Sequence, residues 1–133
     1  MVTTLGQFID FLIDFIIATF LVGLYLLIYT FATAHNEFAL IRRNVLSASL
    51  SLGLSLIGFA IPLSSAIVNT NTLVDLVLWG LVAIVVQIFA YGIVRVVVPD
   101  LTRRIADGEV GTATFLGAVS LAAGIANSAA MTI

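Results

Sequence analysis

The sequence contains no cysteine and no lysine, and only 9% of its 133 residues are charged. Without cysteine, the chain can form no disulfide, no thiolate nucleophile and no zinc–thiolate site. Its five basic residues are all arginines, and the formal net charge is -2. This charge distribution lacks the basic surface by which nucleic-acid-binding proteins contact phosphates. We therefore expect no nucleic-acid partner.

The motifs that usually carry catalysis are missing as well. The sequence has no H-E-x-x-H motif, no P-loop and no G-x-S-x-G nucleophile elbow. The nearest match to the elbow is the run Gly53-Leu54-Ser55-Leu56-Ile57-Gly58, which has one residue too many before its second glycine. No histidine lies in the apolar segments to act as a general base. We expect no enzymatic activity, no cofactor and no metal site.

Apolar residues, by contrast, make up 62% of the chain. An ordinary soluble domain has about 25% charged residues, far more than this chain has. A chain of this length buries only part of its surface when it folds, so a single soluble core cannot cover so many apolar side chains. The composition therefore predicts an integral membrane protein whose apolar surface is covered by the lipid bilayer.

Ionisable residues divide the sequence into four long uncharged runs, each long enough for one spanning helix of about 20 residues. The second run is longer than one helix needs, but Pro62 and the polar residues 69–72 end its helix near Val68. Strands of membrane β-barrels alternate apolar and polar residues, and these continuous runs do not. We predict helices at residues 7–33, 44–68, 73–98 and 109–130.

The positions of the arginines predict the orientation of the helices. Arg42 and Arg43 lie between the first two helices, whereas Arg95, Arg103 and Arg104 lie at or beyond the end of the third. Arginines in short loops mark the cytoplasmic side of a membrane. We therefore expect both longer loops in the cytoplasm and both termini outside.

The same two loops also carry acidic residues, so the predicted cytoplasmic face is mixed in charge. A mixed surface suits a protein partner better than it suits phosphate. The candidate contacts for a cytoplasmic or membrane protein partner are Glu37, Arg42, Arg43, Arg103 and Arg104.

The two halves of the chain resemble each other at an offset of 65 residues. Each half has an acidic helix start, a long apolar helix, an arginine-bearing loop and a helix rich in small residues. Because each unit holds two helices, the copies have the same orientation. We predict an all-α membrane protein of four transmembrane helices, built as two tandem hairpins at residues 1–68 and 69–133. The matched pairs include Asp10 with Asp75, Ala18 with Ala83, Ala48 with Ala113 and Ser55 with Ser120.

Several segments resemble one known family. They are Asn36-Glu37-Phe38-Ala39-Leu40-Ile41-Arg42, Gly58-Phe59-Ala60-Ile61-Pro62-Leu63, Leu78-Trp79-Gly80, and Pro99-Asp100-Leu101 with Arg103-Arg104-Ile105. They are similar to the YjfL-like family, domain of unknown function 350, of small bacterial inner-membrane proteins, and the resemblance covers nearly the whole chain. It implies a duplicated two-helix unit and a bacterial plasma membrane, but it implies no function. Arg43-Asn44 replaces an acidic-Gly-Asn turn that family members often have, which predicts a tighter first loop.

Three aspartates lie near the outer ends of the predicted helices. Asp10 and Asp14 are four residues apart and share one face of the first helix, and Asp75 opens the third helix. Carboxylates inside a membrane are costly and suggest an ion or proton path. Asp75 equally suits a helix cap, because Thr72-x-x-Asp75 is similar to a capping box. Asp14 lies a full turn deeper than Asp10 and is harder to explain as a cap.

Gln87, Tyr91 and Arg95 are spaced four residues apart and form a polar stripe on the third helix. Such a stripe would be costly against lipid, so we expect it to face the bundle or another subunit. There it would join helices by hydrogen bonds or line a conduction path. Arg95 can also reach the membrane surface by snorkelling. Asn127, which matches Pro62 in the repeat, is a further candidate for the polar path.

The second and fourth helices carry small residues along one face, which lets helix backbones approach closely in lipid. Packing is the simpler explanation for this pattern. Alternatively, the hydroxyl groups and the carbonyl that Pro62 frees line a narrow polar path. The residues assigned to helix packing are Ser51, Ser55, Gly58, Pro62, Gly117, Ser120 and Gly124.

Four aromatic residues lie near the expected membrane surfaces. Trp79 is close to the outer surface, and Tyr25, Tyr29 and Tyr91 are close to the inner one, which predicts an interfacial belt. His35 in the first loop suits a pH sensor, although a lone solvated histidine is the simpler interpretation.

Two functions are compatible with these features. The first is a small oligomeric channel or transporter for an ion or small cation, in which the three aspartates form an outer acidic vestibule. A four-helix unit encloses almost no lumen, so this function requires a homo-oligomer. The second is a non-conducting membrane scaffold whose mixed-charge cytoplasmic loops recruit a partner. Asp14 favours the first.

Overall fold

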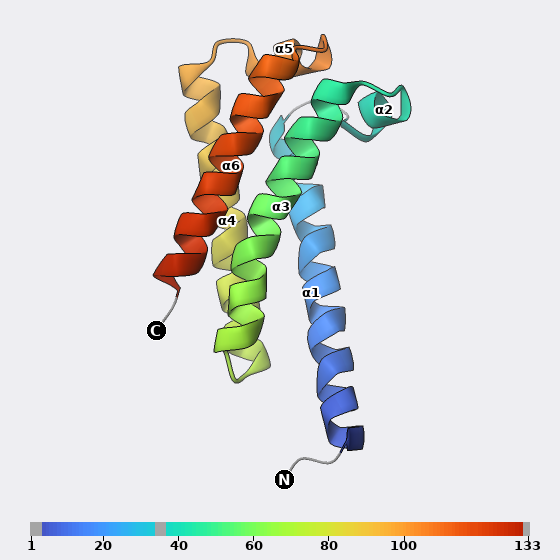
Figure 1. The fold of residues 1–133 in the computed structure, drawn as a ribbon, viewed down its shortest axis with the longest axis vertical. Helices are drawn as coiled ribbons and strands as arrows, with labels where there is room; N and C mark the ends of the chain where they lie inside the picture. Colours follow the sequence, from blue (N-terminus) through green and yellow to red (C-terminus); the bar gives the residue numbers. More distant parts are fainter. Residues whose placement is uncertain (1–3, 34–36, 132–133) are drawn as a thin grey trace.

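The computed structural model describes residues 4–33 and 37–131, apart from the side chains of residues 32, 33, 37 and 38. Within these ranges all regular secondary structure is helical. The long helices run up and down as an elongated bundle, and two short helices lie in the connections (Figure 1). In chain order the helices are α1 (Thr4–Thr33), α2 (Glu37–Arg42), α3 (Leu46–Asn69), α4 (Leu73–Val97), α5 (Leu101–Ala106) and α6 (Val110–Ala130).

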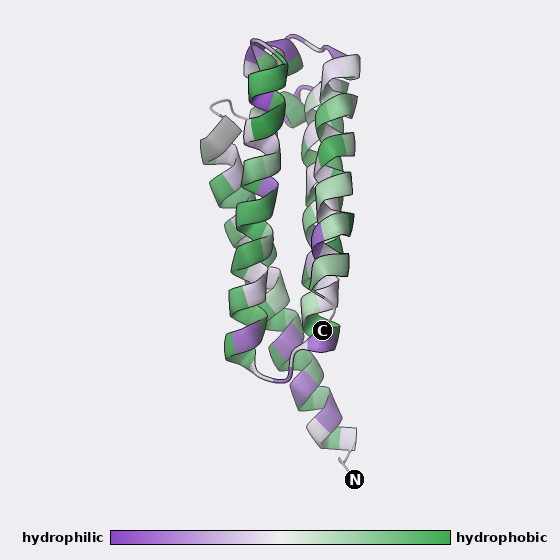
Figure 2. Cartoon of the chain, turned by 90° about the vertical axis from the view of Figure 1, so that its left-hand side faces the viewer, coloured by the Kyte–Doolittle hydropathy of each residue, from purple (hydrophilic) through white to green (hydrophobic). Residues whose placement is uncertain are grey.

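The four predicted spans are confirmed as helices long and apolar enough to cross a membrane, namely α1, α3, α4 and α6. A helix satisfies its interior backbone N–H and C=O groups within the segment, which the bilayer interior requires. Figure 2 shows hydrophobic residues along the lengths of these helices and hydrophilic residues gathered toward the ends of the bundle. The observed bounds are close to the predicted ones, except that α1 already begins at Thr4.

Both longer connections contain a short helix that the sequence analysis did not predict. These helices, α2 and α5, lie together at one end of the bundle, which we call the arginine end (Figure 1). Each is followed by a residue with a left-handed backbone, Asn44 with φ 63° or Gly108 with φ 93°. The next N–H donates to the carbonyl five residues back, at 3.0 Å in both turns. These turns reverse the chain tightly into α3 and α6.

The opposite end of the bundle carries the short turn of residues 70–72 between α3 and α4, and we call it the turn end. Thr70 N–H and Thr70 Oγ1 both donate to the Ala66 carbonyl and so close α3. The first residues of α1 and the last residues of α6 lie toward this end (Figure 1). At this polar turn the chain reverses direction between α3 and α4.

The contact between α3 and α6 is the most extensive in the bundle. A Cβ added to Gly58 would lie 2.5 Å from the Ser120 carbonyl oxygen, and one added to Gly124 would overlap the Gly58 carbonyl. Pro62 lies inside α3 and has no N–H, so the Gly58 carbonyl lacks its usual helical donor. Gly124 of α6 packs directly over that carbonyl, so the Gly58 carbonyl lies in the interface between α3 and α6.

The helix α1 is held to the bundle by its half nearer the arginine end. Its described buried apolar residues are Leu21, Tyr25 and Tyr29, which follow one another at intervals of one turn. Gly80 of α4 leaves room for Leu21, because a Cβ there would lie 2.7 Å from Leu21 Cδ1. Toward its N-terminus α1 diverges from the other helices and extends past the turn end (Figures 1 and 2).

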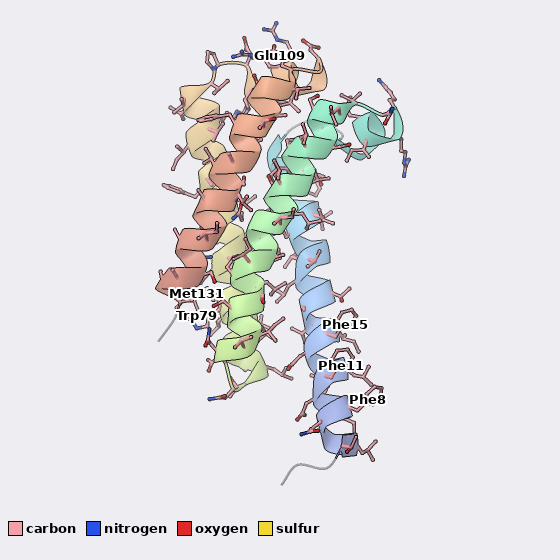
Figure 3. The ribbon with its side chains drawn as sticks, viewed as in Figure 1. Phe8, Phe11, Phe15, Trp79, Glu109 and Met131 are labelled. Carbon is pink, nitrogen blue, oxygen red and sulfur yellow. The ribbon has the colours of Figure 1, made fainter. Side chains whose placement is uncertain are left out.

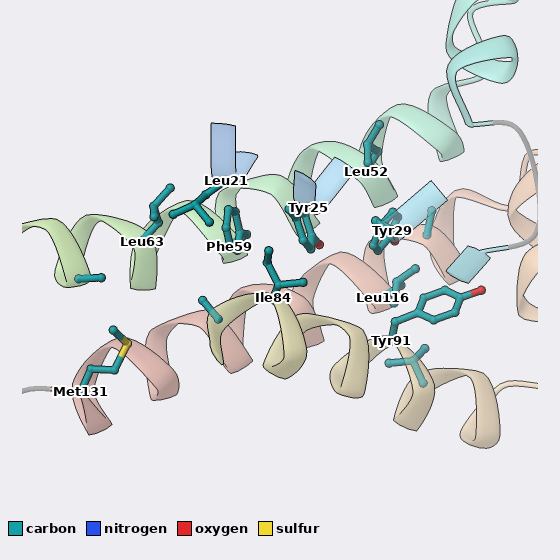
Figure 4. Close-up of a cluster of buried hydrophobic side chains, with 14 of the residues drawn as sticks. Leu21, Tyr25, Tyr29, Leu52, Phe59, Leu63, Ile84, Tyr91, Leu116 and Met131 are labelled. Atoms are coloured by element: carbon teal, nitrogen blue, oxygen red, sulfur yellow. The ribbon is translucent and has the colours of Figure 1, made fainter. Parts of the chain in front are cut away.

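The buried core contains three tyrosines that we expected at the membrane surface (Figure 4). The rings of Tyr25 and Phe59 stack with centroids 4.6 Å apart, and Tyr29 meets Tyr91 edge-on at 5.7 Å. Tyr25 and Tyr29 are 0% exposed and Tyr91 is 3% exposed. The prediction of a tyrosine belt is therefore wrong, because these rings fill the core and bring their hydroxyls to polar partners there. Trp79 is partly buried against the same core.

The half of α1 nearer the turn end is apolar and largely uncovered. Phe8, Phe11 and Phe15 stack along one side of it, with centroid distances of 6.3 and 5.7 Å. In Figure 3 these rings point away from α3. In the most apolar stretch of α1, 11% of residues are buried, compared with 44% in that of α3. This half of α1 is available to lipid or to another chain.

Candidate functional site

A pocket of about 350 Å³ opens between α1 and the turn end. Asp10 and Asp14 line it from α1, and Thr70, Asn71 and Thr72 line it from the turn. The two carboxylates come together because residues four apart on a helix are neighbours. The divergence of α1 leaves the space opposite them. The other lining residues are Ile13, Ile67, Leu73 and Leu76.

The polar groups of this turn-end pocket are mainly oxygen atoms, from two carboxylates, two hydroxyls and one side-chain amide. Asp14 is partly buried and Asp10 is exposed. Among the described residues, no group of three or more His, Cys, Asp or Glu could hold a metal ion. Negatively charged oxygen groups suit a hard cation or an ammonium group. The lining of the pocket is therefore chemically suited to a cation.

Asp75, the third predicted vestibule residue, does not line the pocket. It lies exposed in the first turn of α4, and its backbone N–H donates to Thr72 Oγ1 at 3.1 Å. Thr72 thus caps α4, and the Asp75 carboxylate lies where the positive end of the helix dipole favours it. The geometry supports the capping interpretation of Asp75.

A second polar cluster lies in the buried core, and we call it the central cluster. Ser55 Oγ lies 3.2 Å from Ser120 Oγ and 3.3 Å from the Tyr29 hydroxyl. The Tyr25 hydroxyl donates to the Ser55 carbonyl at 3.5 Å, and Gln87 Nε2 donates to the Ser120 carbonyl at 3.0 Å. All five residues are buried. The central cluster therefore joins α1, α3, α4 and α6 by hydrogen bonds.

The predicted polar stripe of α4 divides between core and surface. Gln87 is 0% exposed and binds α6, and the Tyr91 hydroxyl lies 3.0 Å from Thr102 Oγ1. Arg95 is exposed. Gln87 Oε1 and Asn127 Nδ2 are buried atoms without a hydrogen-bond partner in the described part of the chain. Gln87 and Tyr91 thus join helices, which is one of the two roles their spacing allowed.

The seven residues assigned to helix packing are all buried in α3 or α6. Gly117 is one example, since a Cβ there would overlap the side chain of Leu54. Two further contacts, which the sequence did not predict, hold the arginine end together. Ser47 Oγ donates to the Ile105 carbonyl at 2.6 Å, and Thr102 meets Tyr91. Ser47 lies on the second helix, whose small residues follow one face in the sequence. The sequence does not reveal the partner of Ser47 on α5.

The candidate loop contacts lie at the arginine end. Arg103 pairs with Asp100 at 2.9 Å and Arg104 pairs with Glu109 at 2.8 Å. The first pair is well exposed, and the second is partly exposed. Arg42 and Arg43 are also exposed. The side chain of Glu37 and the whole of His35 lie outside the described residues. The described loop charges are therefore partly neutralised in local pairs and accessible from outside the bundle.

Comparison with known proteins gives one family over nearly the whole chain. The model of the family described as Domain of Unknown Function (DUF350) matches residues 3–131. The UPF0719 inner membrane protein YjfL of Escherichia coli (strain K12) is 38% identical over 128 residues, which cover 96% of this chain and 97% of that protein. The protein of the same name from Escherichia coli O157:H7 matches equally well. No solved structure matches.

Proposed function

We propose that this chain, which belongs to the DUF350 family, is a multi-pass inner-membrane protein that forms a small oligomeric channel or transporter for an ion or small cation. The observation that carries this proposal is the turn-end pocket, in which Asp10 and Asp14 face the polar turn. Carboxylates at the mouth of a pathway raise the local concentration of cations. The name of the YjfL relatives supports the inner membrane as its location.

The conduction path lies between subunits in this proposal. Within one chain, the centre of the bundle is filled by aromatic rings and by the hydrogen-bonded central cluster. The half of α1 nearer the turn end offers the subunit contact. At an offset of 65 residues, the buried Leu76 and Gly80 of α4 match Phe11 and Phe15 of α1, which are 57% and 59% exposed. A second copy would cover these rings.

We also propose that the two halves are a tandem duplication, with hairpins at residues 1–68 and 69–133. The burial pattern supports the predicted offset of 65. The buried residues of α6 match buried residues of α3 one for one: Ala113 with Ala48, Leu116 with Ser51, Gly117 with Leu52, Ser120 with Ser55 and Gly124 with Phe59. Ser55 and Ser120, a matched pair, lie in contact. Asn44 and Gly108 lie in the turns before these helices and are 64 residues apart. The offset between the halves is therefore one residue shorter at this turn than in the helices.

The orientation follows from the arginines. Arg42, Arg43, Arg103 and Arg104 belong to the arginine end, which we assign to the cytoplasm. The turn end and both termini are then outside, and the turn-end pocket opens away from the cell interior. Cations would therefore enter from the outside.

A flux assay with purified full-length protein in liposomes tests the transport proposal. We expect a cation flux that falls about tenfold in the Asp10→Asn/Asp14→Asn variant, because carboxylates at a pore mouth control cation entry. Asp107→Asn, which removes one carboxylate from an exposed loop residue, should leave the flux unaltered. Absence of flux from folded protein, or equal flux in both variants, would contradict the proposal.

The second candidate function is a scaffold, and one observation favours it. The loops at the arginine end are folded into the helices α2 and α5, and α5 is fixed to α3 and α4 through Ser47 and Tyr91. Such a surface is rigid enough to hold a protein partner. A folded protein that passes no cation in the liposome assay would favour this function over transport.

A further inference from the structure

A hollow of about 440 Å³ lies at the arginine end, between the last turn of α4 and the helix α5. Arg95 lines it from α4, and Thr102 and Arg103 line it from α5. Two arginines against the single carboxylate of Asp100 leave the hollow positively charged. Leu101 and Ala106 complete its lining.

Neither arginine is firmly engaged by the protein. Arg95 is exposed and has no ion pair with another described residue. Arg103 pairs with Asp100, but the two side chains are 71% and 64% exposed. Such an exposed pair contributes little, because water screens both charges. A bound anion can therefore compete for both guanidinium groups.

A shallow apolar groove of about 500 Å³ runs along the neighbouring face of α4. Its floor is Gly92, where an added Cβ would meet nothing within 4 Å. Arg95 follows Gly92 by three residues and Ile88 by seven, so the arginine stands at the edge of this face. The groove and the charged hollow are therefore adjacent along one helix. The groove is lined by Ile88, Phe89, Gly92, Ile93, Val96 and Val97.

We propose that the hollow and the groove together bind one anionic phospholipid. The phosphate lies between Arg95 and Arg103, and an acyl chain lies over Gly92. Arginine matches phosphate in charge and in hydrogen-bond geometry, and basic pockets beside spanning helices are typical headgroup sites. A free phosphate ion would use the hollow alone, whereas a lipid uses both parts. This site is independent of the proposed transport function, since it lies at the other end of the bundle.

Native mass spectrometry of the full-length protein in detergent, with phosphatidylglycerol and phosphatidylcholine supplied in equal amounts, tests the site. We expect preferential retention of phosphatidylglycerol. Retention should fall about tenfold in Arg95→Gln/Arg103→Gln, since each basic residue near a lipid surface adds attraction. Gly92→Leu should also reduce retention, because an added Cβ meets nothing within 4 Å there and the larger side chain occupies the groove.

Two matched controls separate the site from general effects. Arg42→Gln/Arg43→Gln removes two exposed arginines on the other loop, and Gly23→Leu adds a side chain to open space on α1. Both should retain phosphatidylglycerol normally, and circular dichroism verifies that every variant is folded. Equal retention of the two lipids, or an undiminished preference in either test variant, would overturn the proposal. Displacement of the lipid by millimolar inorganic phosphate would also overturn it in favour of a soluble anion.

Discussion

At the scale of single residues, the close approach of α3 and α6 depends on glycine. Gly58 and Gly124 allow the backbones of α3 and α6 to touch, and Gly124 packs over the carbonyl that Pro62 leaves without a helical donor. A Cα–H group against a carbonyl oxygen makes a weak hydrogen bond, which partly satisfies that carbonyl. The contact therefore offsets part of the cost of a proline inside a long apolar helix.

Replacing Gly124 should therefore separate the two helices. Gly124→Leu forces a side chain into the Gly58 backbone, and we expect a loss of about 3 kcal/mol in the free energy of unfolding, at the upper end for overpacking a core. Gly111→Leu is the matched control, since a Cβ there meets nothing within 4 Å. Unfolding of both variants in mixed micelles with increasing SDS measures the difference. Equal stability of the two variants would show that the close approach is not formed.

The tyrosines show where residue-level prediction fails. A tyrosine near the end of an apolar run is usually an interfacial anchor. The sequence does not reveal whether the core offers a polar partner for its hydroxyl group. Here Ser55 and Thr102, from other helices, provide the partners for Tyr25, Tyr29 and Tyr91. Only the tertiary arrangement brings these groups together, so composition and position alone misplace the three rings.

At the scale of elements, the four long helices could be predicted because lipid imposes them. Each is a continuous apolar segment of sufficient length, and no other backbone structure suits such a segment in a bilayer. The short helices α2 and α5 were missed because six residues give too little periodicity to detect. Their clearest sequence signals are Asn44 and Gly108, residue types that tolerate the left-handed backbone after a helix.

The pairing of α3 with α6 can be tested directly because the chain has no native cysteine. Ser55→Cys/Ser120→Cys should form an intramolecular disulfide under mild oxidant, since the two hydroxyl oxygens are 3.2 Å apart. Protection of both thiols from alkylation, measured by mass spectrometry, reports the bond. Ser49→Cys/Ser120→Cys is the control, because Ser49 lies exposed on another face of α3. Efficient closure of the control pair, or none of the test pair, would contradict this packing.

At the scale of the whole molecule, the candidate site was only half predictable. The spacing of Asp10 and Asp14 placed both carboxylates on one helix face. The polar turn that forms the opposite wall, and the divergence of α1 that opens the pocket, depend on how the helices pack. Asp75 matches Asp10 at the offset of 65 residues, yet Asp10 lines the pocket, whereas Asp75 lies in the capped first turn of α4.

We propose that two hairpins of the same orientation span the membrane, with the turn end outside. Labelling of single-cysteine variants in intact cells with a membrane-impermeant maleimide tests this topology. Asn71→Cys marks the turn end, and Arg43→Cys and Asp107→Cys mark the two loops of the arginine end. We predict that Asn71→Cys reacts in intact cells, and that the other two react only after the membrane is permeabilised. Reaction of Asn71→Cys on the same side as either loop variant would contradict the architecture.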